Sequence, residues 1–190
     1  MQINSAEYFR SILLPSDLPE YPLPQFAFIG RSNVGKSSFI NTITSQKDLA
    51  RSGATPGVTK KVNLFLINRK IYFADLPGYG YAKLSLQERK KLEELIFWYL
   101  GEATNDFKKI FLLVDSRHGL TPNDADVVNF LHGHGLPTVI IASKVDKLKN
   151  KDRAIKLRNL QNSLPEGFTI IPFSAETNEG KQAVLEAIKL

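Results

Sequence analysis

Short apolar runs alternate along this chain with longer segments in which apolar and charged residues are mixed. The apolar runs predict strands at residues 26–30, 62–68, 70–75, 109–115, 137–143 and 168–174. The second and third runs are separated by a tight connection, so they are expected to pair antiparallel. The mixed segments predict helices at residues 36–44, 84–100, 123–132, 151–160 and 180–190.

This alternation predicts an α/β fold built from βαβ units. We expect three layers, with a six-stranded, mostly parallel sheet, one antiparallel edge strand and about five helices. Four prolines fall between residues 15 and 24, so residues 1–23 are expected to form an extended lead-in. That lead-in should pack along a single domain formed by residues 24–190.

Composition limits the class of protein. The chain has 190 residues, of which 43% are hydrophobic and 23% charged, which is typical of one globular domain and excludes a disordered or collagen-like chain. No apolar run approaches the ~20 residues that a membrane span needs, and the first residues carry no secretory pattern, so we expect no membrane association. The absence of cysteine excludes disulfides, thiolate metal sites and cysteine nucleophiles.

The first chemical motif lies between the first predicted strand and the first predicted helix. Residues 30–37 are G-R-S-N-V-G-K-S, which fits the phosphate-binding loop (P-loop) pattern G-x-x-x-x-G-K-[ST] in the strand–loop–helix context that it requires. Its glycines let backbone N–H groups point at phosphate oxygens, its lysine reaches the terminal phosphates, and its serine offers a hydroxyl to Mg²⁺. The predicted nucleotide-binding residues are Gly30, Arg31, Ser32, Asn33, Val34, Gly35, Lys36, Ser37 and Ser38.

A second motif, after the strand at residues 137–143, predicts that the base is guanine. A carboxylate at Asp146 can accept hydrogen bonds from both N1–H and the 2-amino group of guanine, whereas adenine offers neither donor in that arrangement. The aliphatic stem of Lys144 can cover the face of the base. The motif is Ser143, Lys144, Val145 and Asp146, and the backbone of Phe173, Ser174 and Ala175 is expected to complete the pocket. Asp115 and Arg117, at the end of another strand, are expected to form a local structural pair.

With these residues the chain resembles the P-loop GTPases of the TrmE–Era–EngA–EngB group, which have a Ras-like fold. Four stretches are similar to the EngB (YihA/YsxC) branch: GRSNVGKSS at residues 30–38, TPGVT at 55–59, DLPGYGYAK at 75–83 and VDSRHGLTPND at 114–124. The resemblance extends from about residue 11 to the end of the chain. The base motif of this group usually begins with asparagine or threonine, whereas here it begins with Ser143, whose hydroxyl has a shorter reach than asparagine.

The resemblance implies where two switch segments lie. The second is D-x-x-G, formed by Asp75, Leu76, Pro77 and Gly78, whose carboxylate reaches the Mg²⁺ shell through water and whose glycine N–H meets the γ-phosphate. The first contributes Gly57, Val58, Thr59, Lys60 and Lys61 to GTP binding. The implied metal set is Ser37, Thr59 and Asp75, and the implied catalytic set is Lys36, Thr59 and Gly78.

A further departure concerns the position after D-x-x-G. Many GTPases carry a water-orienting glutamine there, whereas this chain has Tyr79, whose ring has no amide to orient the water. We therefore expect slow intrinsic hydrolysis that depends on a partner or on a second cation. In potassium-stimulated relatives an asparagine three residues before the P-loop lysine contacts K⁺, so Asn33 is a candidate potassium contact, with an ordinary loop residue as the alternative.

The resemblance implies a cytoplasmic GTPase that binds GTP and GDP and assists assembly of the large ribosomal subunit, with ties to the cell cycle and septation. The expected partner is ribosomal RNA or a large-subunit assembly intermediate. We expect a monomer and leave a nucleotide-dependent dimer open. One alternative is a guanine-nucleotide-gated RNA-binding or ribosome-binding module with negligible hydrolysis. Another is an ATP-using P-loop protein, in which Asp146→Asn would leave nucleotide preference unchanged.

Net charge adds a surface to this prediction. The formal charge is +6, and residues 144–158 hold seven basic residues against two acidic ones, a local charge of +5. This segment is a candidate RNA-facing surface beside the guanine pocket, with a solvated helix face as the alternative. Neutralising Lys149, Lys151 and Arg153 together is expected to weaken ribosome association without changing GTP affinity.

Overall fold

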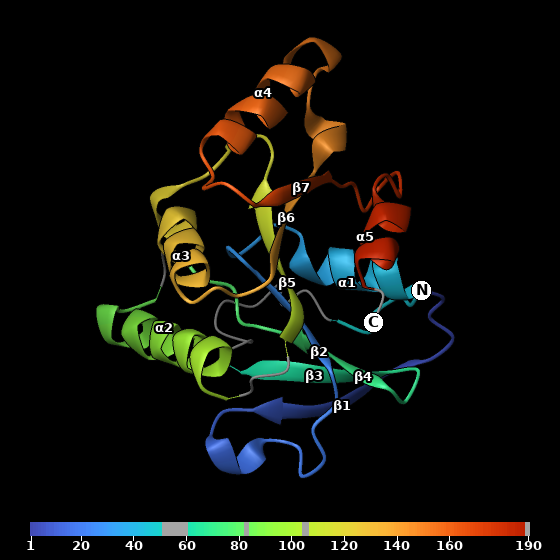
Figure 1. Ribbon diagram of the computed structural model, residues 1–190, viewed down its shortest axis with the longest axis vertical. Helices are drawn as coiled ribbons and strands as arrows, with labels where there is room; N and C mark the ends of the chain where they lie inside the picture. The colour runs from blue at the N-terminus through green and yellow to red at the C-terminus, as the bar shows by residue number, and fades with distance from the viewer. Residues whose placement is uncertain (51–60, 82–83, 104–106, 189–190) are drawn as a thin grey trace.

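In the computed structural model, which describes residues 1–50, 61–81, 84–103 and 107–188, one β-sheet runs through the molecule and helices cover both of its faces (Figure 1). The strands are β1 (Ala6–Ile12), β2 (Gln25–Gly30), β3 (Val62–Ile67), β4 (Ile71–Asp75), β5 (Phe107–Asp115), β6 (Thr138–Ser143) and β7 (Thr169–Pro172). The helices are α1 (Lys36–Thr44), α2 (Leu86–Gly101), α3 (Pro122–Gly133), α4 (Asn150–Asn162) and α5 (Lys181–Ala187). Two 3-10 turns, η1 (Pro15–Asp17) and η2 (Val145–Lys147), complete the described elements.

The sheet has the strand order β1-β3-β4-β2-β5-β6-β7. Strands β4, β2, β5, β6 and β7 run parallel, and β3 pairs antiparallel with both β4 and β1. The predicted α/β class, the mostly parallel sheet and the antiparallel pairing of β3 with β4 are therefore confirmed.

The predicted count of six strands is wrong, because the described residues contain a seventh strand, β1, within the predicted lead-in. β1 is the antiparallel strand at the edge of the sheet, and β3 lies inside the sheet, between β1 and β4. The register between β1 and β3 shifts between Tyr8 and Arg10, so β1 lacks the strict alternation that identifies a strand in a sequence. Its pairing satisfies backbone groups of β3 that would otherwise face water.

Two apolar clusters pack against the two faces of the sheet. One cluster joins the sheet to α2 and α3 and includes the fully buried Tyr99. The other joins the sheet to α1 and α5, and in it the rings of Phe28 and Phe111 stack with centroids 5.4 Å apart. Figure 1 shows this division, with α2 and α3 on one side and α1 and α5 on the other. α4 lies at the end of the molecule next to β6 and β7.

Two helices begin at capping boxes. In each, the side chain of the N-cap residue accepts the backbone N–H of the residue three positions later, and the side chain of that residue accepts the backbone N–H of the N-cap residue. Ser85 caps α2 with Glu88, and Thr121 caps α3 with Asp124. The capping box at Ser85 places the start of α2 two residues after the predicted residue 84. Within the described ranges, none of the helices combines the length and the apolar character that crossing a membrane requires.

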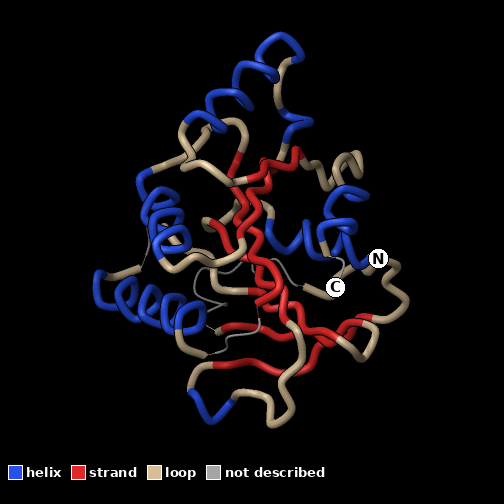
Figure 2. The backbone as a smooth tube through the Cα atoms, in the orientation of Figure 1, coloured by secondary structure: helices blue, strands red, loops and turns tan. Residues whose placement is uncertain are grey.

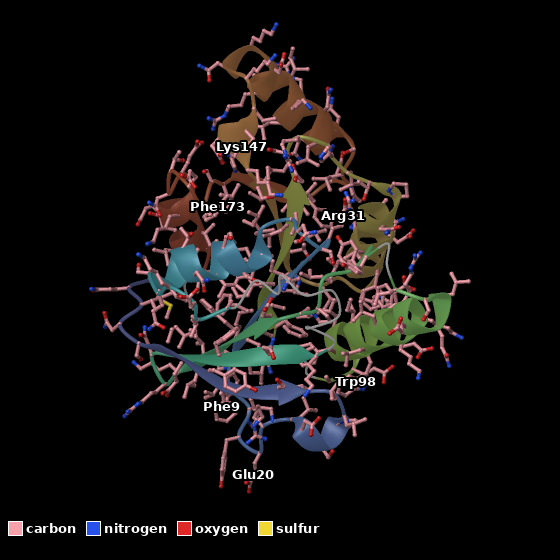
Figure 3. All side chains as sticks on the ribbon, turned by 180° about the vertical axis from the view of Figure 1, so that it is seen from behind. Phe9, Glu20, Arg31, Trp98, Lys147 and Phe173 are labelled. Atoms are coloured by element: carbon pink, nitrogen blue, oxygen red, sulfur yellow. The ribbon has the colours of Figure 1, made fainter. Side chains whose placement is uncertain are left out.

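The parallel strands, which run side by side in Figure 2, bring their carboxyl ends to one edge of the sheet. The residues that end these strands are Gly30, Asp75, Asp115, Ser143 and Pro172. Figure 3 shows Arg31, Lys147 and Phe173 toward the end of the molecule that carries α4, whereas Phe9 and Glu20 lie toward the end that carries β1. The motifs singled out in the sequence follow these strand ends.

Candidate functional site

The loop between β2 and α1 has a backbone path that depends on its glycines. A Cβ on Gly30 would lie 2.8 Å from the carbonyl oxygen of Leu113 in β5, so a larger residue would force the strands apart. Asn33 and Gly35 adopt positive φ angles of 63° and 103° as the chain turns into α1. Gly35 begins α1 without a side-chain cap, which is the kind of helix N-terminus that receives an anion.

The D-x-x-G segment after β4 lies directly against this loop. The Ser32 N–H donates to the carbonyl oxygen of Tyr79 at 2.9 Å, and Arg31 and Tyr79 form an isolated β-bridge. A Cβ on Gly78 would lie 3.1 Å from the Ser32 Cα, so this close approach favours glycine at position 78. A ligand phosphate that contacts the loop is therefore within reach of the second switch segment.

Lys36 and Asp75 form an ion pair between the loop and the end of β4. Both side chains are largely covered, with 10% of the Lys36 side chain and 5% of the Asp75 side chain exposed. Two buried charges offset each other's loss of hydration only while they remain together. A phosphate or a metal ion at this position would compete with the pair for one of the two charges.

A second buried carboxylate, Asp115, holds the lysine of the base motif. Arg117 donates to Asp115 through two side-chain N–H groups at 2.9 and 2.8 Å, and Lys144 Nζ donates to it at 3.0 Å. Burial raises the pKa of Asp115, but the hydrogen bonds from Arg117 and Lys144 outweigh burial and hold the pKa well below its ordinary value. Asp115 is therefore ionised and anchors Lys144.

Lys144 connects the base motif to the phosphate loop. Its Nζ donates to the carbonyl oxygen of Asn33 at 2.6 Å as well as to Asp115. Its φ angle is 59°, a left-handed conformation that lysine rarely adopts and that these two contacts support. A ligand that displaces the base motif would therefore also disturb the phosphate loop.

Ser143, which departs from the usual asparagine or threonine, still bonds to the phosphate loop. Its Oγ lies 2.9 Å from the carbonyl oxygen of Val34 and 3.1 Å from that of Val114. Both contacts are buried, so the hydroxyl has protein acceptors in place of water. The shorter serine side chain is sufficient because β6 passes close to the loop.

Asp146 presents a fixed, charged carboxylate in the turn η2. Its Oδ1 accepts a hydrogen bond from Ser174 Oγ at 2.7 Å, and its Oδ2 lies 3.1 Å from Lys147 Nζ. Apart from this ion pair, Oδ2 makes no hydrogen bond within the described residues. Burial raises the pKa of Asp146, but the Ser174 hydroxyl and the Lys147 ammonium lower it by more, so the carboxylate is ionised and can accept N–H donors.

The segment between β7 and α5 fixes Ser174 in place. Ser174 Oγ accepts the backbone N–H groups of Glu176 and Thr177 at 3.2 and 3.1 Å. Gly180 closes the segment with a φ angle of 79°, and a Cβ there would lie 2.1 Å from the Pro172 carbonyl oxygen. Only glycine allows this tight return, which holds the serine hydroxyl beside Asp146.

Tyr79 is buried, and its hydroxyl donates to Asp124 Oδ1 at 2.6 Å. Burial and the neighbouring Asp124 carboxylate raise the pKa of Tyr79 well above its ordinary value, so the phenol keeps its proton. Asp124 also accepts from the Thr121 hydroxyl at 2.6 Å within the α3 capping box. The residue after D-x-x-G is therefore tied to the start of α3.

The sequence-predicted site residues differ in what they can present to a ligand. The side chains of Val34, Leu76, Pro77, Val145 and Phe173 are buried, so only their backbones can face one. Ser38, Lys61 and Ala175 are exposed. Gly57, Val58, Thr59 and Lys60 lie outside the described residues. The remaining predicted residues belong to the loop, the D-x-x-G segment and the base motif described above, apart from Ser174 in the segment between β7 and α5.

The donors near the phosphate loop fit a magnesium ion bound together with phosphate. Within the described ranges there is no cluster of three or more histidine, cysteine, aspartate or glutamate side chains that could hold a metal alone. Mg²⁺ usually takes only one or two protein carboxylates and completes its shell with phosphate and water. Asp75 supplies a carboxylate and Ser37 a hydroxyl beside the loop, which is such a donor set.

Sequence reasoning predicted the pair of Asp115 with Arg117, which the ion pair confirms, but it missed two links. It did not predict the bond from Asp115 to Lys144 or the bond from Tyr79 to Asp124. One signal was available for the first link: Asp115 and Ser143 end adjacent parallel strands, and such ends meet at one edge of the sheet. No sequence signal pairs Tyr79 with Asp124, which are 45 residues apart.

Comparison with known proteins places this arrangement among nucleotide-binding proteins. Residues 25–144 match a protein-family model described as 50S ribosome-binding GTPase. The "Probable GTP-binding protein EngB" of Exiguobacterium sp. strain AT1b is 44% identical and covers 99% of this chain and 96% of its own. The protein of the same name from Thermosipho africanus is 40% identical and covers 100% of this chain and 98% of its own.

Solved structures agree with the fold. A crystal structure titled as a probable GTP-binding protein EngB superposes with a TM-score of 0.70 at 25% identity and covers 86% of this chain and 96% of its own. Era from Aquifex aeolicus superposes with a TM-score of 0.67 at 23% identity and covers 88% of this chain and 56% of its own. The second likeness concerns the fold alone.

Proposed function

Because this chain belongs to the EngB family of GTP-binding proteins, within the 50S ribosome-binding GTPases, we propose that its GTPase cycle assists assembly of the large ribosomal subunit. In this proposal the protein works in the cytoplasm as a monomer. One structural observation supports a nucleotide switch in particular: the phosphate loop, Asp75 and Asp146 follow strand ends at the same edge of the sheet. The Lys36–Asp75 pair and Lys144 link these parts.

Asp146 selects guanine in this proposal. Its ionised carboxylate accepts N1–H and the 2-amino group of the base, while the Ser174 hydroxyl fixes its orientation. A base that lacks these two donors leaves a partly buried charge unpaired, which costs about 1.5–3 kcal/mol for each hydrogen bond lost. The stem of Lys144 covers one face of the base.

The phosphate chain occupies the loop between β2 and α1. Lys36 leaves Asp75 to bind the terminal phosphates, and backbone N–H groups at the start of α1 bind the others. Ser37 and Asp75 would hold Mg²⁺, together with Thr59, and the bound ion neutralises charge on the phosphates. The backbone N–H of Gly78 meets the γ-phosphate, which makes the D-x-x-G segment sensitive to hydrolysis.

In this proposal, efficient hydrolysis requires a group beyond the residues named above. The Tyr79 hydroxyl is engaged by Asp124, so this side chain has no group left to orient an attacking water. A second cation beside Asn33, or the assembly partner, would supply the missing charge stabilisation. This accounts for an expected slow intrinsic rate.

Phosphate release tests the proposal directly. Turnover of GTP is measured in KCl and in NaCl, with and without large-subunit precursors. We expect KCl or the precursor to raise the rate about 10-fold or more, because one added electrostatic contact to the transition state has that order of effect. Asn33→Ala should remove the KCl effect and keep the precursor effect. Absence of release under all four conditions would instead favour the alternative, a binding module gated by guanine nucleotide.

The basic segment after Asp146 is the proposed ribosome-facing surface, and its charges are not equivalent. Lys144 and Lys147 are paired with Asp115 and Asp146 inside the site, and Arg153 is paired with Glu179. Within the part of the chain that the structure describes, Lys149, Lys151 and Arg158 form no ion pair, and all three are exposed. These three can reach RNA phosphates without breaking a contact within the protein.

A triple substitution tests this surface. Changing Lys149, Lys151 and Arg158 to glutamine should weaken co-sedimentation with large ribosomal subunits at least about 10-fold at low salt and flatten its salt dependence. Arg158 replaces Arg153 in the design, because Arg153 anchors the segment that carries Ser174. A triple change of Lys47, Lys70 and Lys91, which are exposed residues outside α4, is the matched control. Equal loss in both triple variants would refute a specific surface.

A further inference from the structure

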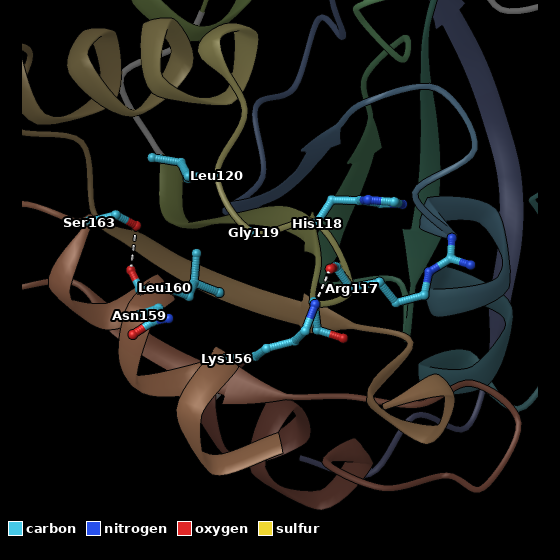
Figure 4. Close-up of a pocket in the computed structure, with 9 residues that line it drawn as sticks. Arg117, His118, Gly119, Leu120, Lys156, Asn159, Leu160 and Ser163 are labelled. Atoms are coloured by element: carbon cyan, nitrogen blue, oxygen red, sulfur yellow. Dashed lines mark hydrogen bonds between the residues drawn. The ribbon is translucent and has the colours of Figure 1, made fainter. Parts of the chain in front are cut away.

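A pocket lies between the loop that follows β5 and the face of α4 turned toward it (Figure 4). Its volume is about 350 Å³, within the range of small-ligand sites. The loop contributes residues 116–120, and α4 with the residue after its end contributes Lys156, Asn159, Leu160 and Ser163. The pocket is separate from the nucleotide site, because Asp146, Ser174 and the phosphate loop do not line it.

The lining offers hydrogen-bonding groups around a small apolar floor. Lys156 Nζ donates to the Arg117 carbonyl oxygen, which leaves two of its three N–H donors for a ligand. Leu120 and Leu160 supply the apolar surface.

We propose that this pocket binds one nucleotide of a single-stranded RNA segment. The inference rests on the proposed function and deepens it, because it assigns the RNA contact to a second site. A phosphate fits the Lys156 ammonium, a base fits the leucine floor, and the Asn159 amide can both donate to and accept from base edges or a 2′-hydroxyl. Among the described residues no acidic side chain lines the pocket, so an anionic backbone meets no repulsion there.

Position on the molecule favours RNA over a free small molecule. Lys149, the N-cap residue of α4, lies seven residues before Lys156 and therefore on the same side of the helix. Its ammonium is exposed and forms no ion pair within the described residues, so it can hold a neighbouring phosphate of the strand. The loop also connects the pocket to the nucleotide site, because Arg117 lies in the lining and pairs with Asp115, which holds Lys144. RNA bound in the pocket would therefore contact Arg117, which is connected through Asp115 to Lys144 of the base motif.

The test uses the full chain loaded with a GTP analogue and a fluorescent single-stranded uridine oligonucleotide. Asn159→Glu places a carboxylate in the pocket, whereas Asn162→Glu places the same charge on α4 outside the lining and serves as the control. We expect Asn159→Glu to weaken RNA binding at least about 10-fold in fluorescence anisotropy, because the carboxylate repels the RNA backbone at close range and offsets the attraction of the Lys156 ammonium, and Asn162→Glu to change it little. GTP-analogue affinity should stay constant in both variants.

A second measurement needs no substitution. Photo-crosslinking of the wild-type protein with the 4-thiouridine form of the oligonucleotide should map to residues 116–120 or 156–163. Crosslinks confined to other segments, or unchanged RNA affinity in Asn159→Glu, would overturn the pocket while leaving the GTPase and the ribosome-facing surface intact. If Asn159→Glu loses subunit binding but the wild type binds no oligonucleotide, the pocket serves a ribosomal protein and the RNA proposal is wrong.

Discussion

Asp146→Asn is expected to lower the affinity for GTP by about 10²–10⁴-fold and to create affinity for xanthosine triphosphate. The estimate follows from the loss of two charge-assisted hydrogen bonds, each of about 1.5–3 kcal/mol, to N1–H and the 2-amino group of guanine. Xanthine carries a carbonyl in place of the 2-amino group, and the asparagine amide can donate to it. In the wild type, Ser174 and Lys147 hold the two carboxylate oxygens of Asp146 in a defined orientation.

Calorimetric titration with GTP, ATP and xanthosine triphosphate measures the change. Asp152→Asn, on α4 and outside the base motif, is the control for loss of one negative charge. If Asp146→Asn kept its preference for GTP over ATP, the base would be read elsewhere and the ATP-using alternative would regain support. A uniform loss for all three nucleotides would point to misfolding of η2, which circular dichroism and thermal unfolding would reveal.

The parts of this fold that could be predicted are those determined by short, continuous stretches of sequence. The phosphate loop is identified by residues 30–37 alone, since glycine, lysine and serine at fixed spacing have few other structural uses. Helix α1 begins and ends at the predicted residues, Lys36 and Thr44. The strands β5 and β6 each contain a continuous apolar run, at residues 110–114 and 139–142, as expected for strands covered on both faces.

The parts that could not be predicted depend on partners distant in sequence. β1 is stabilised by its pairing with β3, and the register shift at Tyr8 hides its periodicity. Ser143 is shorter than the usual asparagine, and the sequence does not show that its hydroxyl lies 2.9 Å from the Val34 carbonyl oxygen of the phosphate loop. The bond of Asp115 to Lys144 depends on two strands ending side by side, which local sequence alone does not show. The bond of Tyr79 to Asp124 joins separate elements, and nothing in either local segment specifies the other.

Lys36→Met should abolish GTP turnover and also destabilise the nucleotide-free protein. Removal of one electrostatic contact to the phosphates is expected to lower turnover at least about 10²-fold. In addition, the Asp75 carboxylate loses the ammonium beside it and remains buried, and breaking a buried ion pair in this way costs about 3–5 kcal/mol. Urea unfolding without nucleotide measures the second effect, and Lys47→Met, at an exposed lysine, is the control.

The double variant Lys36→Met, Asp75→Asn separates the two roles of the pair. It removes the unpaired charge, so the free energy of unfolding should return most of the way to the wild-type value, whereas turnover should stay lost. Asp75→Asn alone frees Lys36 from its partner and should leave phosphate binding in place while weakening the dependence of nucleotide affinity on Mg²⁺. If Lys36→Met were as stable as the wild type, the ion pair would contribute nothing to the nucleotide-free state. Nucleotide binding would then not have to break it, and the competition between Asp75 and phosphate for Lys36 would not exist.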